Sequence, residues 1–210
     1  MTAHLRIGLD FDNTIIQYDQ VFYKLALARG FIGIDIPQTK QAVRGFLRGQ
    51  SRGEIQWQIL QAEVYGPRLG EARPFPGIEA FLSDGIRQGA KFFIVSHKNR
   101  FAAQDREYRH DLIEASQTWL SSYGIVGEDR PVCAADVYFE SSRLKKCERI
   151  ASLGCDVFID DLEEIFAEPG FPRATKAILI GQKQDTNMAF GILCCQSWQD
   201  VTSAVFGHVG

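Results

Sequence analysis

The 210-residue sequence lacks the features that mark membrane, secreted and nucleic-acid-binding proteins. No stretch approaches the roughly 20 consecutive apolar residues that a membrane helix needs. The net charge of −3 leaves no basic excess for nucleic acid or for an anionic membrane surface. The first residues run directly into a strand-like segment rather than into a signal peptide, so we expect a cytoplasmic protein.

Cysteine is present five times, without the spacing of a metal site or a disulfide framework. No two cysteines form a C-x-x-C pair, which argues against a zinc site. The odd number and the irregular spacing argue against a set of disulfides. We therefore expect reduced and mostly buried thiols, with a redox role for the adjacent pair Cys194-Cys195 as the less favoured alternative.

Apolar residues, by contrast, make up 45% of the chain, enough for the core of one domain with a modest insertion. Five short runs rich in Ile, Val and Phe predict strands that are covered on both faces. These runs are residues 5–11, 91–95, 136–139, 156–159 and 177–180. Helical periodicity is found in 76–89, 111–123, 143–153 and 197–210. The alternation predicts an α/β fold, with a Rossmann-like parallel β-sheet core flanked by helices.

The alternation is interrupted between residues 17 and 73, where no convincing strand is found. Three helix-like pieces occupy this stretch, at residues 18–29, 37–48 and 51–65. Ser51 and Glu54 match a capping box that would open the third of them. We therefore predict that residues 17–73 form a small helical cap inserted after the first strand. Residues 1–16 and 74–210 would then form the core.

The predicted cap carries side chains that could select a substrate by gripping an anion or stacking on a ring. They are Arg44, Arg48, Arg52, Trp57 and Tyr65. A solvated helix face explains the arginines more simply, and packing explains the aromatic residues more simply.

Two of the predicted strands end in a pair of acidic residues. Asp10 and Asp12 end the first strand, where alternation along an extended chain puts both on one side. Asp160 and Asp161 follow the apolar run 156–159. Strand ends of a parallel sheet meet at one edge, where four carboxylates would repel one another unless a hard divalent cation such as Mg²⁺ joined them. Taken singly, such acids more often cap helices or turns.

Two further polar residues suit a phosphate-binding edge. Ser96 follows the second strand, and its hydroxyl could donate to a phosphate oxygen, although a turn residue is an equally good interpretation. Lys146 precedes the strand that ends at Asp160 and could neutralise a phosphate charge. A solvated surface lysine is the alternative, and the adjacent Lys145 could be the residue that acts instead.

Together these residues resemble the four motifs of the haloacid dehalogenase-like superfamily in order, spacing and context. The motif residues are Asp10-Phe11-Asp12-Asn13-Thr14, Ser96, Lys146 and Asp160-Asp161. The resemblance extends from residue 5 to about 181, and the helical insertion occupies the place of that family's cap. Asn13 stands where many members have glycine. The resemblance implies a Mg²⁺-dependent phosphatase for a small phosphorylated metabolite, without a nucleic acid polymer or membrane as partner, acting as a monomer or homodimer.

The resemblance also implies a role for each matched residue. Asp10 would be the nucleophile that forms an aspartyl-phosphate, and Asp12 the general acid and base. Ser96 and Lys146 would bind the transferred phosphoryl group and balance its charge. The expected metal ligands are Asp10, Asp12 (through its carbonyl), Asp160 and Asp161. The expected substrate-binding residues are Thr14, Ser96, His97 and Lys98.

Three alternatives remain open at this stage. A 5′-nucleotidase-like specificity is compatible with the first motif, and a phosphotransferase would differ only in its acceptor. A catalytically idle domain that binds a ligand or a partner would be expected to have lost an acid, the serine or the lysine, all of which are present. Dehalogenases of the superfamily lack the metal and the second acid, so Asp12 argues against that chemistry.

Overall fold

The computed structural model describes residues 4–105, 109–181 and 191–207. The chain divides into two compact units. The first comprises Met1–Ile15, Pro74–Lys98 and Tyr123–Gly210, and the second comprises Ile16–Arg73 and Asn99–Ser122. In the described part of the chain, no helix has the length and apolar character that crossing a membrane requires.

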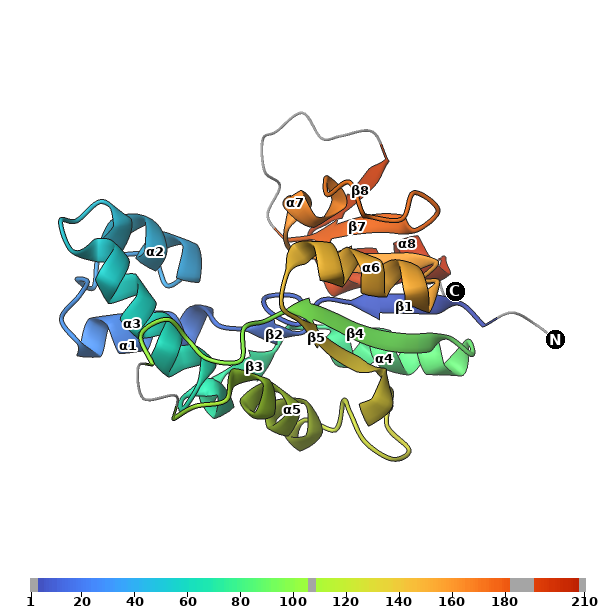
Figure 1. Ribbon diagram of the computed structural model, residues 1–210, viewed down its shortest axis with the longest axis horizontal. Helices are drawn as coiled ribbons and strands as arrows, with labels where there is room; N and C mark the ends of the chain where they lie inside the picture. The colour runs from blue at the N-terminus through green and yellow to red at the C-terminus, as the bar shows by residue number, and fades with distance from the viewer. Residues whose placement is uncertain (1–3, 106–108, 182–190, 208–210) are drawn as a thin grey trace. The chain divides into compact units, whose positions relative to one another are not determined.

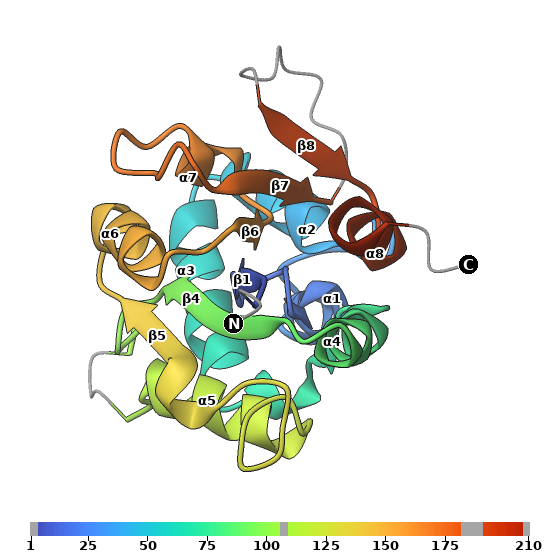
Figure 2. The same cartoon turned by 90° about the vertical axis from the view of Figure 1, so that its right-hand side faces the viewer.

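The first unit is built on a six-stranded parallel sheet with the order β5-β4-β1-β6-β7-β8 (Figures 1 and 2). The strands are β1 (Arg6–Leu9), β4 (Lys91–His97), β5 (Val137–Glu140), β6 (Val157–Asp160), β7 (Lys176–Ile180) and β8 (Ile192–Cys195). The first five confirm the predicted strands. The sixth, β8, was not predicted, because it is a short edge strand that leaves Leu193 and Cys194 exposed.

Helices cover both faces of this sheet, as the α/β pattern requires. They are α4 (Ile78–Arg87), α6 (Arg143–Leu153), α7 (Glu163–Phe166) and α8 (Trp198–Phe206), with a short 3-10 turn η2 (Ala134–Asp136) before β5. Figure 2 shows α4 and α8 on one face and α6 on the other. Consecutive β4 residues point to opposite faces, so Phe92 packs against Phe81 of α4 while Phe93 packs with Phe158 and Ile150.

Two local features, a glycine in β1 and the caps of α6, determine how the elements near the strand ends pack and where they begin and end. Gly8 in β1 leaves room for Phe158, because a Cβ at position 8 would lie 2.4 Å from that ring. Helix α6 is capped at its start by Ser142, whose hydroxyl accepts the N–H of Lys145, and at its end by Gly154, which adopts φ +58°. The predicted bounds of this helix are therefore confirmed.

The second unit is helical and has an aromatic core. Its elements are α1 (Asp19–Ala28), α2 (Lys40–Arg48), α3 (Gly53–Tyr65), η1 (Leu69–Glu71) and α5 (Leu112–Ser122). Phe22 stacks on Trp57 with ring centroids 4.8 Å apart. The Lys40 ammonium lies 5.5, 5.8 and 5.6 Å from the ring centroids of Tyr18, Phe22 and Tyr65. Packing thus accounts for Trp57, while Arg44, Arg48 and Arg52 are exposed.

Three details of the second unit differ from the sequence-based description. The predicted capping box of Ser51 and Glu54 is wrong: α3 begins at Gly53, and Glu54 pairs with Arg48 at 2.8 Å. Residues 99–122, assigned above to the core, group with the helices, since α5 packs on η1 and α3. A separate two-stranded sheet is formed by β2 (Ile16–Gln17) and β3 (Arg73–Pro74), where no strand was recognised.

Candidate active site

The strand order brings three sequence-predicted residues to one edge of the sheet. Strand β1 lies between β4 and β6, and all three run in the same direction. Ser96 lies near the end of β4, Asp10 follows β1 directly, and Asp160 is the last residue of β6. The Asp10 N–H donates to the Ile159 carbonyl at 2.9 Å, which extends the β1–β6 pairing by one residue beyond β1. Carboxyl ends of adjacent parallel strands therefore gather these side chains.

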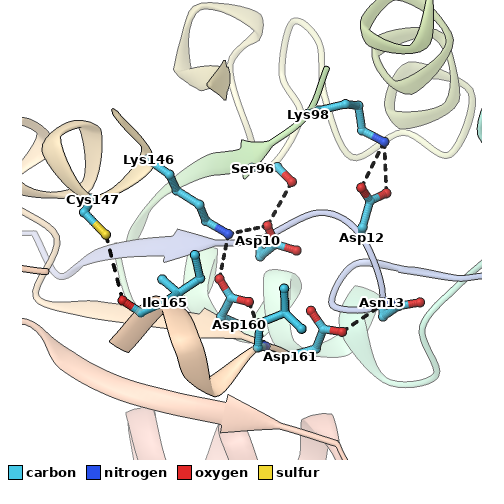
Figure 3. Close-up of polar contacts among 11 residues, drawn as sticks. Asp10, Asp12, Asn13, Ser96, Lys98, Lys146, Cys147, Asp160, Asp161 and Ile165 are labelled. Atoms are coloured by element: carbon cyan, nitrogen blue, oxygen red, sulfur yellow. Dashed lines mark hydrogen bonds and ion pairs between the residues drawn. The ribbon is translucent and has the colours of Figure 1, made fainter. Parts of the chain in front are cut away.

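Lys146 of α6 joins two of the buried carboxylates (Figure 3). Its Nζ donates to Asp10 Oδ1 and to Asp160 Oδ2, at 2.6 Å in both cases. Burial alone would lower the pKa of Lys146, but the charges of Asp10 and Asp160 outweigh that effect and raise it, so the ammonium form persists. The adjacent Lys145 is exposed, so Lys146 is the lysine that the helix directs into the site.

Asp10 is fixed by a second donor as well. The Ser96 hydroxyl donates to Asp10 Oδ1 at 2.8 Å, so this oxygen accepts from both Ser96 and Lys146. The Asp10 residue is only 4% exposed. Two donors on one oxygen restrict the rotation of the carboxyl group.

Asp12 pairs with Lys98, a contact that was not predicted from the sequence. The Lys98 ammonium lies 3.0 Å from both carboxylate oxygens of Asp12 and 5.2 Å from the centre of the Phe11 ring. The Lys98 side chain is buried, whereas Asp12 is half-buried. Lys98, predicted as a substrate contact, thus binds the predicted acid and base. His97, also predicted as a substrate contact, is exposed.

The loop after β1 is held in place by hydrogen bonds at its ends. The Ile15 N–H donates to the Phe11 carbonyl at 3.0 Å, and the Trp198 indole donates to the Thr14 carbonyl at 3.1 Å. Within the described residues, the buried Thr14 hydroxyl is without a hydrogen-bond partner. Asn13 donates from its side-chain amide to Asp161 Oδ2 at 3.1 Å. The loop is thereby linked to the acid that follows β6.

The donor set fits a hard divalent cation. Asp10, Asp160 and Asp161 each offer a carboxylate oxygen, and these atoms lie within 4.8 Å of one another. Oxygen-only ligands of this kind are the ones that Mg²⁺ prefers. Among the described residues, the Asp12 carboxylate is not part of this group.

The charges of the site also leave room for a cation. Burial raises the pKa of Asp160 to about 6, and the Asp10 carboxylate adds to the rise although Lys146 opposes it. Four acids face two lysines at this edge, which leaves two negative charges uncompensated when all are ionised. A divalent cation would balance that excess.

No family model and no curated protein matches the sequence, whereas solved structures match nearly the whole chain. A haloacid dehalogenase-like hydrolase from Streptococcus pneumoniae is 14% identical, with a TM-score of 0.55 over 97% of this chain and 99% of that chain. A predicted phosphoglycolate phosphatase from Haemophilus somnus is 13% identical, with a TM-score of 0.52 and the same coverage. A dehalogenase is 10% identical, with a TM-score of 0.56 over 98% of both chains.

The chain has the haloacid dehalogenase-like fold. The expected fold class is thus confirmed, with a parallel sheet flanked by helices. Structures with this fold include a dehalogenase as well as a predicted phosphatase, so the fold alone does not choose between attack on carbon and attack on phosphorus. That choice depends on the side chains at the sheet edge.

Proposed function

We propose that the protein is a Mg²⁺-dependent phosphatase that hydrolyses a small phosphomonoester through nucleophilic attack by Asp10. The observation that carries the proposal is the setting of Asp10, which is buried between Ser96 and Lys146 and lies beside Asp160 and Asp161. This setting supplies a fixed nucleophile, donors for a phosphoryl group and ligands for a cation. Phosphoryl transfer depends mainly on such positioning and charge neutralisation.

In the first half of the reaction, an Asp10 oxygen would attack phosphorus while the bond from phosphorus to the leaving oxygen breaks. The product is an aspartyl-phosphate and an alcohol, and Asp12 would donate the proton that the leaving oxygen takes up. Ser96 and Lys146, which both contact Asp10, would turn toward the phosphoryl oxygens. Bound Mg²⁺, held by Asp10, Asp160 and Asp161, would reduce the repulsion between the phosphate and the attacking carboxylate.

In the second half, water would attack phosphorus and release Asp10. Asp12 takes the proton from that water and is then ready for the next cycle. The contact with the Lys98 ammonium would hold the Asp12 side chain in place for this step. The approach of a phosphate dianion would offer Lys98 a second anionic partner.

The same side chains argue against haloacid dehalogenation. Displacing a halide from carbon needs the attacking carboxylate but neither a leaving-group acid nor a cation site. Here Asp12 is fixed by a buried lysine, and two further carboxylates accompany Asp10. Four acids at one edge repel one another unless positive charge balances them, and a cation bound there could also contact the oxygens of an anionic substrate.

Release of inorganic phosphate from p-nitrophenyl phosphate and a panel of metabolite phosphates tests the proposal. The wild type should release phosphate with Mg²⁺ and lose activity in a chelator, and Asp10→Asn should lower the rate by about 1,000-fold or more. Asp129→Asn, at an exposed loop position, is the matched control and should keep full activity. A rate that ignores both Mg²⁺ and Asp10 would show that the proposed nucleophile is wrong. The ratio of phosphate to phosphorylated product in added alcohol separates a phosphatase from a phosphotransferase.

A further inference from the structure

Asn13 has a backbone conformation that most residues avoid. Its φ is +58°, in the left-handed region, where glycine is favoured and asparagine is among the few side chains tolerated. Glycine would satisfy this backbone at no steric cost. The backbone alone therefore does not explain an asparagine between Asp12 and Thr14, and the side chain calls for a reason of its own.

The side chain supplies that reason through a contact with Asp161. The Asn13 Nδ2 donates to Asp161 Oδ2 at 3.1 Å, across 148 residues of sequence (Figure 3). Asp161 is half-buried and offers one of the three carboxylate oxygens that lie within 4.8 Å of one another. A hydrogen bond to one oxygen of a carboxyl group restricts its rotation, and so sets where the other oxygen lies.

The chemistry of the donor suits a metal ligand. A neutral amide orients a carboxylate without adding a positive charge that would compete with a cation. Lys146 bonds Asp10 and Asp160 with a full positive charge, whereas the Asn13 amide that donates to Asp161 is neutral. Hydrogen bonds to metal ligands of this kind commonly change metal affinity by about 10- to 100-fold.

We propose that Asn13 is a positioning residue for the magnesium site, acting by fixing the Asp161 carboxyl group. The left-handed backbone aims the amide, and the amide orients the ligand. This inference rests on the cation site of the proposed function, although it does not depend on which phosphate ester is the substrate.

The test measures Mg²⁺ binding in the absence of substrate. Mg²⁺ is titrated while the melting temperature is followed, and the concentration that gives half of the maximal rise in melting temperature is compared between variants. Asn13→Gly keeps the left-handed backbone and removes only the amide. Its matched control is Asp129→Gly, because Asp129 is also a non-glycine residue with positive φ (+54°) and is exposed. Asp161→Asn and the double variant Asn13→Gly/Asp161→Asn complete a cycle.

We expect Asn13→Gly to raise the half-saturating Mg²⁺ concentration about ten-fold, while Asp129→Gly leaves it unchanged. Asn13→Gly should add little in the Asp161→Asn background, since the amide then has no ligand to orient. Unchanged binding in Asn13→Gly, or full additivity with Asp161→Asn, would overturn the inference alone. A wild type with no Mg²⁺-dependent shift would overturn the cation site and the inference together. If Asn13→Gly binds Mg²⁺ more weakly than the wild type, but the wild type hydrolyses no phosphate ester, the inference is upheld and the proposed activity is rejected.

Discussion

Replacing Lys146 with methionine should destabilise the protein more than any change at the exposed lysine beside it. The Lys146 ammonium lies 2.6 Å from oxygens of Asp10 and Asp160, which are 4% and 0% exposed. Methionine has similar length and helix propensity, so the change removes the charge and little else. Removing one partner of a buried ion pair costs about 3–5 kcal/mol. For a chain of this size that corresponds to a fall in melting temperature of roughly 6–20 °C.

The pH dependence of this loss has a defined sign. Burial already raises the pKa of Asp160 to about 6, and Lys146 is the charge that limits the rise. Without Lys146 the pKa rises further. An acid whose pKa is higher in the folded state opposes folding when it is ionised, so the penalty is complete above the folded pKa. It then shrinks as the pH falls toward the ordinary aspartate value of about 3.9. Excess Mg²⁺ should also reduce the penalty, since it supplies positive charge to the same carboxylates.

Thermal unfolding followed by circular dichroism, at about pH 8 and about pH 5, measures both effects. Lys145→Met is the matched control on the same helix, and its free energy of unfolding should stay within about 0.5 kcal/mol of the wild-type value. The reasoning is refuted if Lys146→Met melts with the wild type at the higher pH. It is also refuted if the deficit of Lys146→Met grows on acidification, because Asp160 would then not be the group left unpaired.

Two further predictions concern other parts of the chain. All five cysteines are free thiols, and three of them are buried: Cys147, Cys155 and Cys195. Burial raises the pKa of Cys155 to about 12, which keeps its thiol unreactive at mildly alkaline pH. An alkylating reagent should therefore label Cys133 and Cys194 in the folded protein, and the three buried cysteines only after unfolding. Mass spectrometry of the labelled protein measures this. Lys40→Met should lower the free energy of unfolding of the helical unit by about 1–2 kcal/mol, because the Lys40 ammonium lies over three aromatic rings. Lys24→Met, at an exposed position, should leave that free energy unchanged. Urea unfolding measures both, and equal stability of the two variants would contradict this prediction.

The sequence predicted the buried strands well because each is a short continuous apolar run. Strands β1, β4 and β6 are covered on both faces, and such strands leave a pattern that does not depend on distant partners. Strand β8 left a weaker pattern, since two of its four residues are exposed at the sheet edge. Helix α5 was predicted from the sequence, but it was assigned to the core rather than to the helical unit. The contacts that assign it to the helical unit, such as the Trp119 indole donating to the Ala72 carbonyl at 3.1 Å, join residues far apart in sequence.

The candidate site was predictable in its positions and less so in its pairings. The acids and Ser96 were located because strand ends of a parallel sheet share an edge. The choice of Lys146 over Lys145 also had a signal in the sequence, since Lys146 lies four residues before buried Ile150 and so shares its helix face. The partners of Lys98 and Asn13 depend on loop conformation and on side-chain rotamers. Neither is set by periodicity, so both contacts emerged only from the structure.

The pairings explain how four acids can lie at one edge of a sheet when no cation is bound, and why the same edge is still suited to binding a cation. Each acid accepts a hydrogen bond from another residue of the site. The pairs are Asp10 with Ser96 and Lys146, Asp12 with Lys98, Asp160 with Lys146 and the Leu162 N–H, and Asp161 with Asn13. These donors offset the repulsion among the carboxylates, yet three of them are neutral and add no charge: the Ser96 hydroxyl, the Leu162 N–H and the Asn13 amide. The two lysines therefore leave a net negative charge on the four acids. That excess supports the proposal of a divalent cation, because a site already neutralised by its own side chains would attract a cation only weakly.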